Sequence, residues 1–218
     1  VYVSQDNLFL TANAENSTVL HKIDLDSNLN YEASGEVSGV LGWGAQSQLR
    51  LDEQDGYLRV VTSDYQGESP VHQLSVLEQE GEELQVVASL PNDNQTEAIG
   101  KPGEDIFAVR FVEERAYIVT FQRIDPLYVI DLENNLQPTI AGSLEIPGFS
   151  SYLHPLDGDY LLGIGQEVSV GNLPTGNNQA TDPDQSTTPV EPVVSEGMKL
   201  SLFDVSNPAN PIEVKLSL

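Results

Sequence analysis

Hydrophobic and polar residues alternate in short runs along nearly the whole chain, and Gly, Asp, Asn or Pro residues interrupt the runs. In the stretch LRLDEQDGYLRVVTS, residues 49–63, two alternating runs flank an acidic turn that contains glycine. This pattern is typical of a β-hairpin with one buried face. Similar hairpins are predicted at 1–11, 109–121 and 153–165. Helical periodicity is nearly absent, so we predict an all-β fold.

The segment after each predicted hairpin is a strand that ends on an acidic residue. These strands are VLHKIDL, VHQLSVLE, DPLYVIDL and MKLSLFDV, and their last acids are Asp24, Glu78, Asp131 and Asp204. Another strand begins seven residues after each acid, at Tyr31, Gln85, Pro138 and Pro211. A constant offset in four places indicates an internal repeat, which a β-sandwich does not show.

Each repeat therefore has an inner strand, its hairpin partner, an acid-terminated strand and an outer strand. Four antiparallel strands in 45–55 residues are typical of a β-propeller blade. We predict about four blades, at residues 1–37, 46–90, 104–146 and 150–218. The first repeat begins within its inner strand, so we expect a fragment of a larger propeller, with roughly six to eight blades.

A polar segment at 169–197 interrupts the fourth repeat. It has almost no aromatic or large apolar residues, so we predict a flexible loop that does not fold on its own. Its DPDQ sequence, at 182–185, lacks most of the spacing of a calcium-binding loop.

The charge balance is strongly acidic, with 34 Asp and Glu residues against 9 Lys and Arg and a net charge of −25. Such a surface repels phosphate groups, which disfavours nucleic acids and anionic membranes as partners. No apolar run is long enough to span a membrane, and the chain has no cysteine for disulfides or thiolate metal sites. A protein, a glycan or a small anionic ligand remains as the predicted partner.

Three basic residues are the candidate ligand-binding residues: Arg50, Arg110 and His154. Arg50 and Arg110 each precede a tyrosine by seven residues, and His154 precedes one by six, so we place all three at equivalent inner-strand positions. Inner strands line the channel of a propeller, where such donors suit a carboxylate or another anion. The alternative is that each pairs with a nearby acid, such as Asp52 or Glu113.

The strand-ending acids Asp24, Asp131 and Asp204 have two possible roles. They could be calcium ligands, or their carboxylates could accept backbone N–H groups in the turns that follow. We favour the turn role, and we predict no cofactor and no metal site. The three histidines have no metal-binding spacing, and no sequence motif of a catalytic nucleophile or a phosphate-binding loop is present.

The amino-acid sequence of several segments resembles that of the secreted bacterial β-propeller-domain proteins. These segments are VYVSQDNLFLT, VLHKIDL, DEQDGYLRVVT, RAYIVTFQRIDPLYVIDL, IPGFSSYLHPLDGDYLLGIG and MKLSLFDVSNPANPIEV, which together extend over nearly the whole chain. The resemblance implies export from the cytoplasm and a longer native protein. It implies no particular reaction, and no catalytic residue is transferred from it.

We therefore predict an exported binding or scaffold module, and we favour a role without enzymatic activity. One alternative is a hydrolase or lyase that acts on a polymer at the channel mouth, which requires charged side chains from different blades to converge. Another is a calcium-stabilised structural domain. We also expect the edge of the incomplete first blade to pair with another chain.

Overall fold

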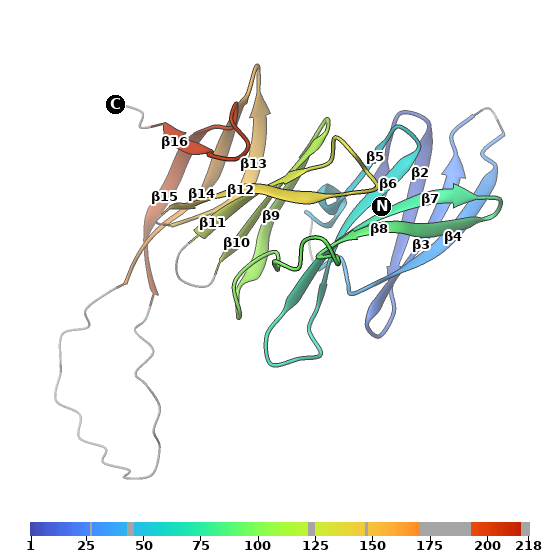
Figure 1. Cartoon of the computed structure of the whole chain (residues 1–218), viewed down its shortest axis with the longest axis horizontal. Coiled ribbons are helices and arrows are strands. Elements are labelled where there is room, and N and C mark those ends of the chain that lie inside the picture. The colour runs from blue at the N-terminus through green and yellow to red at the C-terminus, as the bar shows by residue number, and fades with distance from the viewer. Residues whose placement is uncertain (27, 43–45, 122–124, 147, 171–192, 215–218) are drawn as a thin grey trace, which may run out of the picture.

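The computed structural model describes residues 1–26, 28–42, 46–121, 125–146, 148–170 and 193–214. Its elements are β-strands and one short 3-10 turn, η1 (Ser47–Arg50). The strands follow one another in four antiparallel groups of four, which we call blades 1 to 4 (Figure 1). The prediction of an all-β fold with four-stranded antiparallel blades is confirmed.

The strands of the first two blades form one continuous hydrogen-bonded sheet. Blade 1 consists of β1 (Tyr2–Val3), β2 (Asn7–Asn13), β3 (Ser17–Asp24) and β4 (Tyr31–Ser38). Blade 2 consists of β5 (Leu51–Gln54), β6 (Tyr57–Asp64), β7 (Val71–Glu80) and β8 (Glu83–Leu90). The junction between them is a single parallel bridge from Ser34 on β4 to Glu83 on β8, so the two blades keep their own four-stranded order.

The other two blades are separate sheets. Blade 3 consists of β9 (Asp105–Val112), β10 (Arg115–Phe121), β11 (Asp125–Asp131) and β12 (Thr139–Ile146). Blade 4 consists of β13 (Phe149–Leu156), β14 (Tyr160–Val170), β15 (Val193–Asp204) and β16 (Ile212–Val214). In each blade the strands pair in chain order, with the first strand at one edge.

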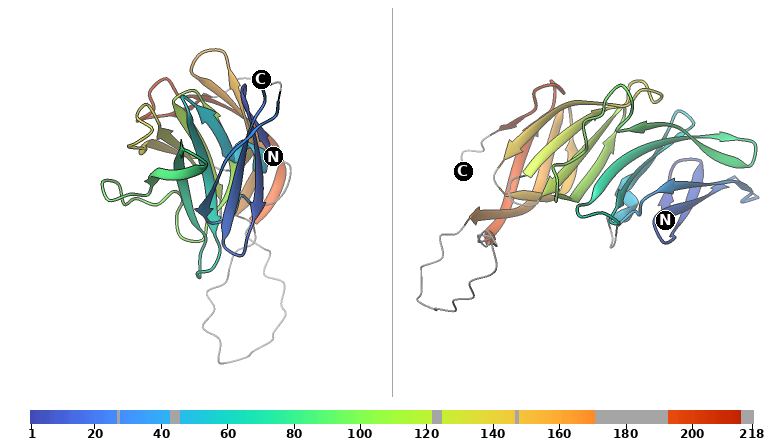
Figure 2. Two further views of the ribbon diagram at one scale, coloured as in Figure 1. Left: turned by 90° about the vertical axis from the view of Figure 1, so that its right-hand side faces the viewer. Right: turned by 60° about the horizontal axis from the view of Figure 1, so that its bottom comes forward.

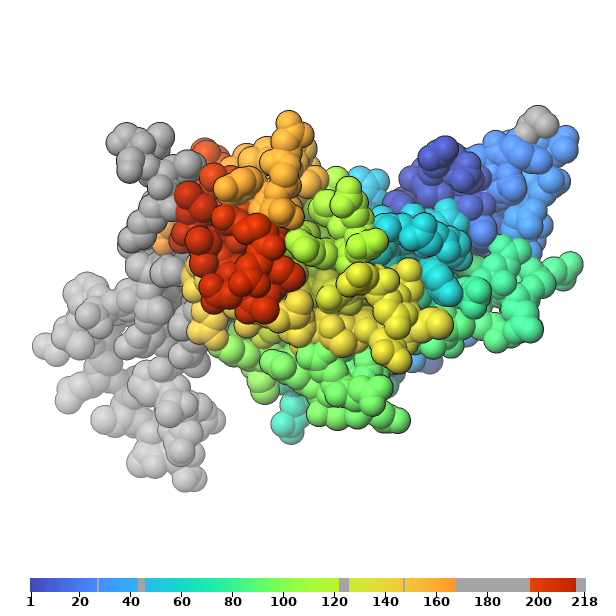
Figure 3. Space-filling model, turned by 45° about the horizontal axis from the view of Figure 1, so that its top comes forward, coloured from blue at the N-terminus to red at the C-terminus, as the bar shows by residue number. Residues whose placement is uncertain are grey.

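The four blades stand side by side in chain order, as the colour blocks of Figure 3 show. Blades 1 and 4 lie at opposite ends of this row in Figures 1 and 2, so the described residues form an open arc. The four blades therefore do not close into a ring.

The hydrophobic core consists of three clusters, and each lies between two successive blades. The strand β10 shows how one blade contributes residues to two clusters. Its residues Ala116 and Ile118 belong to the cluster shared with blade 2, whereas Tyr117 and Val119 belong to the cluster shared with blade 4. A strand in a middle blade buries both of its faces, so its sequence, RAYIVTF, is a nearly continuous apolar run.

The acid-terminated strands end as predicted in three of the four blades. The carboxylates of Asp24, Asp131 and Asp204 each accept a hydrogen bond from the backbone N–H two residues later, at 2.6, 2.8 and 3.0 Å. This confirms their predicted role in the turn. In blade 2 the prediction was wrong, because β7 continues beyond Glu78 to Glu80.

Two predicted boundaries need correction. The inner strand of blade 2 does not include Arg50, because residues 47–50 form the turn η1 and β5 begins at Leu51. The polar segment predicted as a loop at 169–197 begins and ends in strands, since β14 continues to Val170 and β15 starts at Val193. The valines at both ends of the segment pair there, Val170 with Val193. The rest of that segment, including DPDQ, lies outside the described residues.

Candidate functional site

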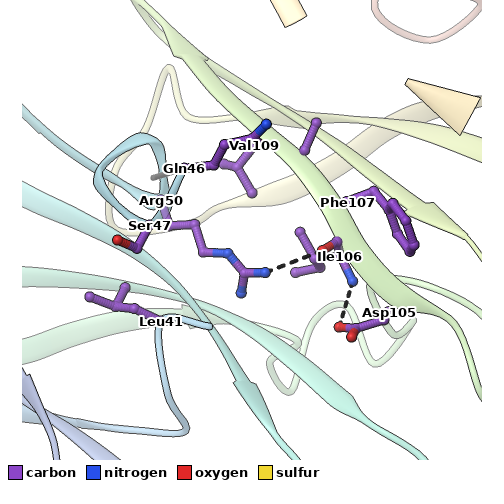
Figure 4. A pocket seen from close by; sticks show the side chains of 9 residues that line it. Leu41, Gln46, Ser47, Arg50, Asp105, Ile106, Phe107 and Val109 are labelled. Atoms are coloured by element: carbon purple, nitrogen blue, oxygen red, sulfur yellow. Dashed lines mark hydrogen bonds between the residues drawn. The ribbon is translucent and has the colours of Figure 1, made fainter. Parts of the chain in front are cut away.

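The first candidate site is a pocket of about 340 Å³ between blade 2 and blade 3, which we call the Arg50 pocket. One wall is the turn η1 with its flanking residues, and the other is the first half of β9 (Figure 4). Its lining residues are Leu41, Gln46, Ser47, Arg50, Asp105, Ile106, Phe107, Ala108 and Val109. The pocket therefore combines an apolar wall with one cation and one carboxylate.

Arg50 extends from η1 across this pocket to β9 (Figure 4). Its guanidinium group donates to the carbonyl oxygen of Ile106 at 3.3 Å and to the hydroxyl oxygen of Ser63 at 3.2 Å. The side chain fits beneath Gly42, where an added Cβ atom would lie 3.2 Å from the guanidinium carbon. Arg50 is only 9% exposed, and this burial lowers the pKa of its guanidinium group.

Asp105 is the carboxylate of the Arg50 pocket, but it does not form an ion pair with Arg50. Its Oδ1 atom accepts hydrogen bonds from the hydroxyl group of Tyr65 and from the backbone N–H of Ile106, both at 2.8 Å. Asp105 is therefore held to its own strand and to Tyr65. Its charge still raises the pKa of Arg50, although less than burial lowers it.

Behind Arg50, a buried chain of hydrogen bonds connects blade 2 to blade 3. His72 Nε2 lies 2.9 Å from the backbone carbonyl oxygen of Glu104, which can only accept, so this nitrogen carries the proton. His72 Nδ1, 2.8 Å from the Ser63 hydroxyl oxygen, is then the acceptor. The direction of donation is from Arg50 to Ser63, from Ser63 to His72, and from His72 to Glu104.

This chain predicts how stability depends on pH. Burial lowers the pKa of His72 below its usual 6.5, so the folded protein keeps the ring neutral while the unfolded chain takes up a proton. Stability supplied by neutral His72 is complete above pH 6.5 and is lost as the pH falls toward the folded-state pKa. The charged groups that act on this ring are Arg50, Glu104 and Asp105.

We expect the His72→Gln variant to lose this part of the acid sensitivity. The difference in unfolding free energy between wild type and variant, measured by urea denaturation, should shrink from pH 7.5 to pH 5. His21 and His154 are present in both proteins, so their contributions cancel. A difference that stays constant over this range would contradict a buried neutral His72.

The second candidate site is a neighbouring pocket of about 480 Å³, which we call the Arg110 pocket. It lies between the inner ends of blades 1, 2 and 3 and is lined by Val1, Tyr2, Val3, Gln48, Leu49, Leu51, Asp52, Arg110 and Phe111. Arg110 is half-buried, and its Nε atom is buried without a hydrogen-bond partner. Arg110 pairs with Tyr117, so its side chain is on the face of β9 that packs against blade 4.

Asp52 also lines the Arg110 pocket, but its carboxylate is bound to Arg59. Arg59 is 0% exposed, donates from Nε to Asp52 at 2.9 Å, and donates from Nη2 both to Asp52 and to Gln54. Its guanidinium group also lies over the ring of Phe111, 5.3 Å from the ring centre. The acid of this pocket is thus already neutralised, whereas Arg110 is not.

The three predicted site residues are not brought together. Arg50 and Arg110 lie in the two neighbouring pockets. His154 is exposed on β13, where its Nδ1 atom lies 3.2 Å from the hydroxyl group of Tyr152, and it lines neither pocket. The convergence that would have favoured a hydrolase or lyase is therefore absent from these two pockets.

The predicted equivalence of the three residues was partly wrong. Arg110 and Tyr117 form the third residue pair from the hairpin turn, and His154 and Leu162 form the matching third pair in blade 4. In blade 2 that position is occupied by Asp52, which pairs with Arg59. Aligning the repeats by their tyrosines gave the wrong register for blade 2. Tyr57 is the first residue after its turn, whereas Tyr117 is the third residue after its turn.

The pairing of Asp52 with Arg59 was missed, although the sequence contains the signal for it. The Asp-Gly turn at 55–56 favours a two-residue hairpin loop, which places residue 52 directly opposite residue 59. Both turn residues have positive φ, 53° and 83°, as this loop requires. The chain of hydrogen bonds through Ser63, His72 and Glu104 joins distant segments, and no local pattern indicates it.

Five of the seven Lys and Arg residues in the described part of the chain form ion pairs with acids. The pairs are Lys22–Glu53, Arg59–Asp52, Lys101–Glu145, Arg115–Asp159 and Lys199–Glu213. The two remaining described basic residues are Arg50 and Arg110, each of which lines a pocket. In a chain with so many acids, two arginines that form no ion pair within the described residues are unusual.

No metal site is evident among the residues that the structure describes, which contain no group of three or more His, Asp or Glu side chains arranged to hold an ion. The same residues include no helix that is long and apolar enough to cross a membrane.

Comparison with known proteins identifies the relatives of this chain. A family model described as a beta propeller domain matches residues 1–217. An uncharacterized protein of Methanocaldococcus jannaschii, MJ1554, is 36% identical over 201 residues, which cover 90% of this chain and 25% of that protein. An uncharacterized protein of Archaeoglobus fulgidus is 34% identical over 207 residues, which cover 91% of this chain and 26% of that protein.

These comparisons modify what the resemblance implied. Both relatives are archaeal, so the bacterial origin is not supported, and export from the cytoplasm stays a prediction. The chain spans about a quarter of the length of each relative.

Proposed function

The chain belongs to the beta propeller domain family, and on this premise we propose that it is a binding module whose inner wall recognises ligands with carboxylate groups. Propeller domains present rigid loops and a central wall that suit binding, although the fold alone names no ligand. The choice of ligand class rests on the chemistry of Arg50 and Arg110.

The observation that carries this proposal is that, among the described residues, no acid forms an ion pair with Arg50 or Arg110. A buried cation without a counter-ion is costly, because the protein interior does not replace the solvation that it loses. Arg50 is nine-tenths buried and hydrogen-bonded only to neutral oxygen atoms. Two such bonds leave further N–H groups of the five-donor guanidinium fork for a carboxylate, which this fork binds well.

The composition of the Arg50 pocket suits an anion with an apolar body. Leu41, Ile106 and Val109 provide the apolar wall beside the guanidinium group of Arg50 (Figure 4). The charge of Asp105 opposes an incoming anion, so this pocket should bind carboxylates weakly. Benzoate, a planar carboxylate with an apolar ring, is a suitable first probe.

We expect benzoate to bind the wild-type protein with a Kd on the order of 1 mM, and Arg50→Gln to weaken binding at least about tenfold. Asp105→Asn should strengthen binding by a few-fold, since the amide keeps the acceptor oxygen for Tyr65 and Ile106 but removes the negative charge. The measurement is an NMR titration of the backbone and arginine side-chain N–H signals in about 0.15 M salt.

Asp105→Asn is the control for misfolding, because a folding defect can lower the affinity for benzoate but does not raise it. Arg115→Gln is the matched control: this arginine is half-buried, pairs with Asp159 and lies outside both pockets. Benzoate binding that is unchanged in both Arg50→Gln and Asp105→Asn would rule out the Arg50 pocket as the site.

A further inference from the structure

The chain contains two acceptor motifs for N-linked glycans, in which an asparagine is followed two residues later by a serine or threonine. They are NST at residues 16–18 and NQT at residues 94–96. An enzyme that attaches a glycan has to reach both the asparagine amide and the hydroxyl group of the third residue. The surroundings of these two groups therefore decide which motif the folded protein presents.

The motif at 94–96 lies at the surface, in the connection between the outer strand of blade 2 and the first strand of blade 3. Asn92 and Gln95 close a turn by backbone hydrogen bonds in both directions, at 2.9 and 3.1 Å, with Asp93 and Asn94 at its tip. Asn94 and Thr96 are both exposed. Within the described residues, the side-chain amide of Asn94 makes no hydrogen bond, although its backbone N–H donates to Asn92 at 2.9 Å.

The middle residue, Gln95, fixes this motif against blade 3. Its amide nitrogen donates to the carbonyl oxygen of Ile140 on β12 at 3.3 Å, and its amide oxygen accepts from the N–H of Ile140 at 2.8 Å. These two bonds hold the turn in place while Asn94 and Thr96 remain in contact with solvent. Both groups that the enzyme needs are thus accessible without any unfolding.

The motif at 16–18 is instead engaged in the fold. The side-chain amide of Asn16 donates to the carboxylate of Asp64 at 3.0 Å. Thr18 is 0% exposed, and its hydroxyl group donates to the carbonyl oxygen of Gly39 at 2.9 Å. The hydroxyl group of this motif becomes accessible only when the hairpin opens.

We propose that Asn94 is an N-glycosylation site of the folded protein and that Asn16 is not. In this reaction the amide nitrogen of Asn94 attacks C1 of a sugar that is carried on a lipid phosphate. The new bond joins this nitrogen to C1, the bond from C1 to the phosphate oxygen breaks, and the lipid phosphate leaves while a base of the enzyme takes the amide proton. Such glycans are found on exported proteins, which is the location predicted for this chain, and the inference does not depend on the Arg50 pocket.

The test incubates the folded full chain with an oligosaccharyltransferase and a lipid-linked sugar, and peptide mass spectrometry measures the glycan occupancy of each asparagine. We expect the occupancy of Asn94 to be at least about tenfold that of Asn16, because Asn16 is presented only by local unfolding. Two synthetic peptides with the sequences of residues 12–20 and 90–98 should be modified to similar extents, since neither is folded. A peptide 12–20 that is not modified would trace the difference to local sequence and overturn the structural argument.

Variants of the full chain test each group of the motif. Asn94→Gln and Thr96→Ala should abolish the modification, Thr96→Ser should retain it, and Asn16→Gln is the matched control that should leave it unchanged. A folded chain in which Asn94 is not modified, or in which Asn16 is modified as fully as Asn94, would overturn the proposal.

Discussion

The Asp52→Ala variant should lose about 3–5 kcal/mol of unfolding free energy, because it leaves the guanidinium group of Arg59 charged and buried without a counter-ion. Arg59 is 0% exposed, and of its ion-pair partners in the described residues Asp52 is the only one. The side chain of Arg59 packs over Phe111 and across the inner hairpin of blade 2, so it has no route to solvent.

The partner variant, Arg59→Met, should cost less than Asp52→Ala. The side chain of Asp52 is 24% exposed, against 1% for Arg59, so the charge that remains after Arg59→Met is still partly solvated. Removing both charges should cost less than the sum of the two single changes, as expected for a directly interacting pair. Urea denaturation of the four proteins, followed by circular dichroism, gives the comparison.

The more exposed pair of Arg115 with Asp159 is the control for this experiment. Its side chains are 30% and 57% exposed and lie 3.4 Å apart, so Asp159→Ala should cost less than about 1 kcal/mol. Equal losses for Asp52→Ala and Asp159→Ala would show that the burial of Arg59 does not matter.

The Gly142→Val variant is expected to lose about 3 kcal/mol, although valine favours strands far more than glycine does. Gly142 lies on the outer strand of blade 3, where an added Cβ atom would approach the carbonyl oxygen of Pro208 to 2.5 Å and that of Ala209 to 2.8 Å. These are backbone atoms of blade 4, so a larger side chain must push the two blades apart.

Gly67→Val is the matched control for Gly142→Val. Gly67 is exposed, and its nearest neighbour in space is a backbone oxygen at 3.6 Å, so the change should stay within about 0.5 kcal/mol. Chemical denaturation again provides the measurement. A Gly142→Val protein as stable as wild type would mean that blades 3 and 4 do not pack closely at their outer strands.

Gly35 shows that this close approach recurs between blades 1 and 2. A Cβ atom there would lie 2.3 Å from the carbonyl oxygen of Leu84 on the outer strand of blade 2. In the sequence, both glycines are merely weak strand formers within otherwise ordinary strands. Only the packing of one blade on the next explains why a side chain is excluded at these positions.

The candidate site was predictable in its residue types and not in its arrangement. Arg50 and Arg110 were found because arginine is rare in this chain and both precede an inner hairpin. Their places in two consecutive pockets depend on the turn η1, which no alternation pattern indicated. His154 followed the same repeat, but its strand belongs to blade 4, and it lines neither the Arg50 pocket nor the Arg110 pocket.

The sequence by itself determined the fold class, the four-strand repeat and the turns after Asp24, Asp131 and Asp204, because these depend on alternation and on contacts within a few residues. The open arc, the buried pair of Arg59 with Asp52 and the unpaired state of Arg50 and Arg110 were decided only by the tertiary structure. Whether a charge has a partner depends on side chains that neighbouring strands and successive blades bring together, and separation along the chain does not encode those distances.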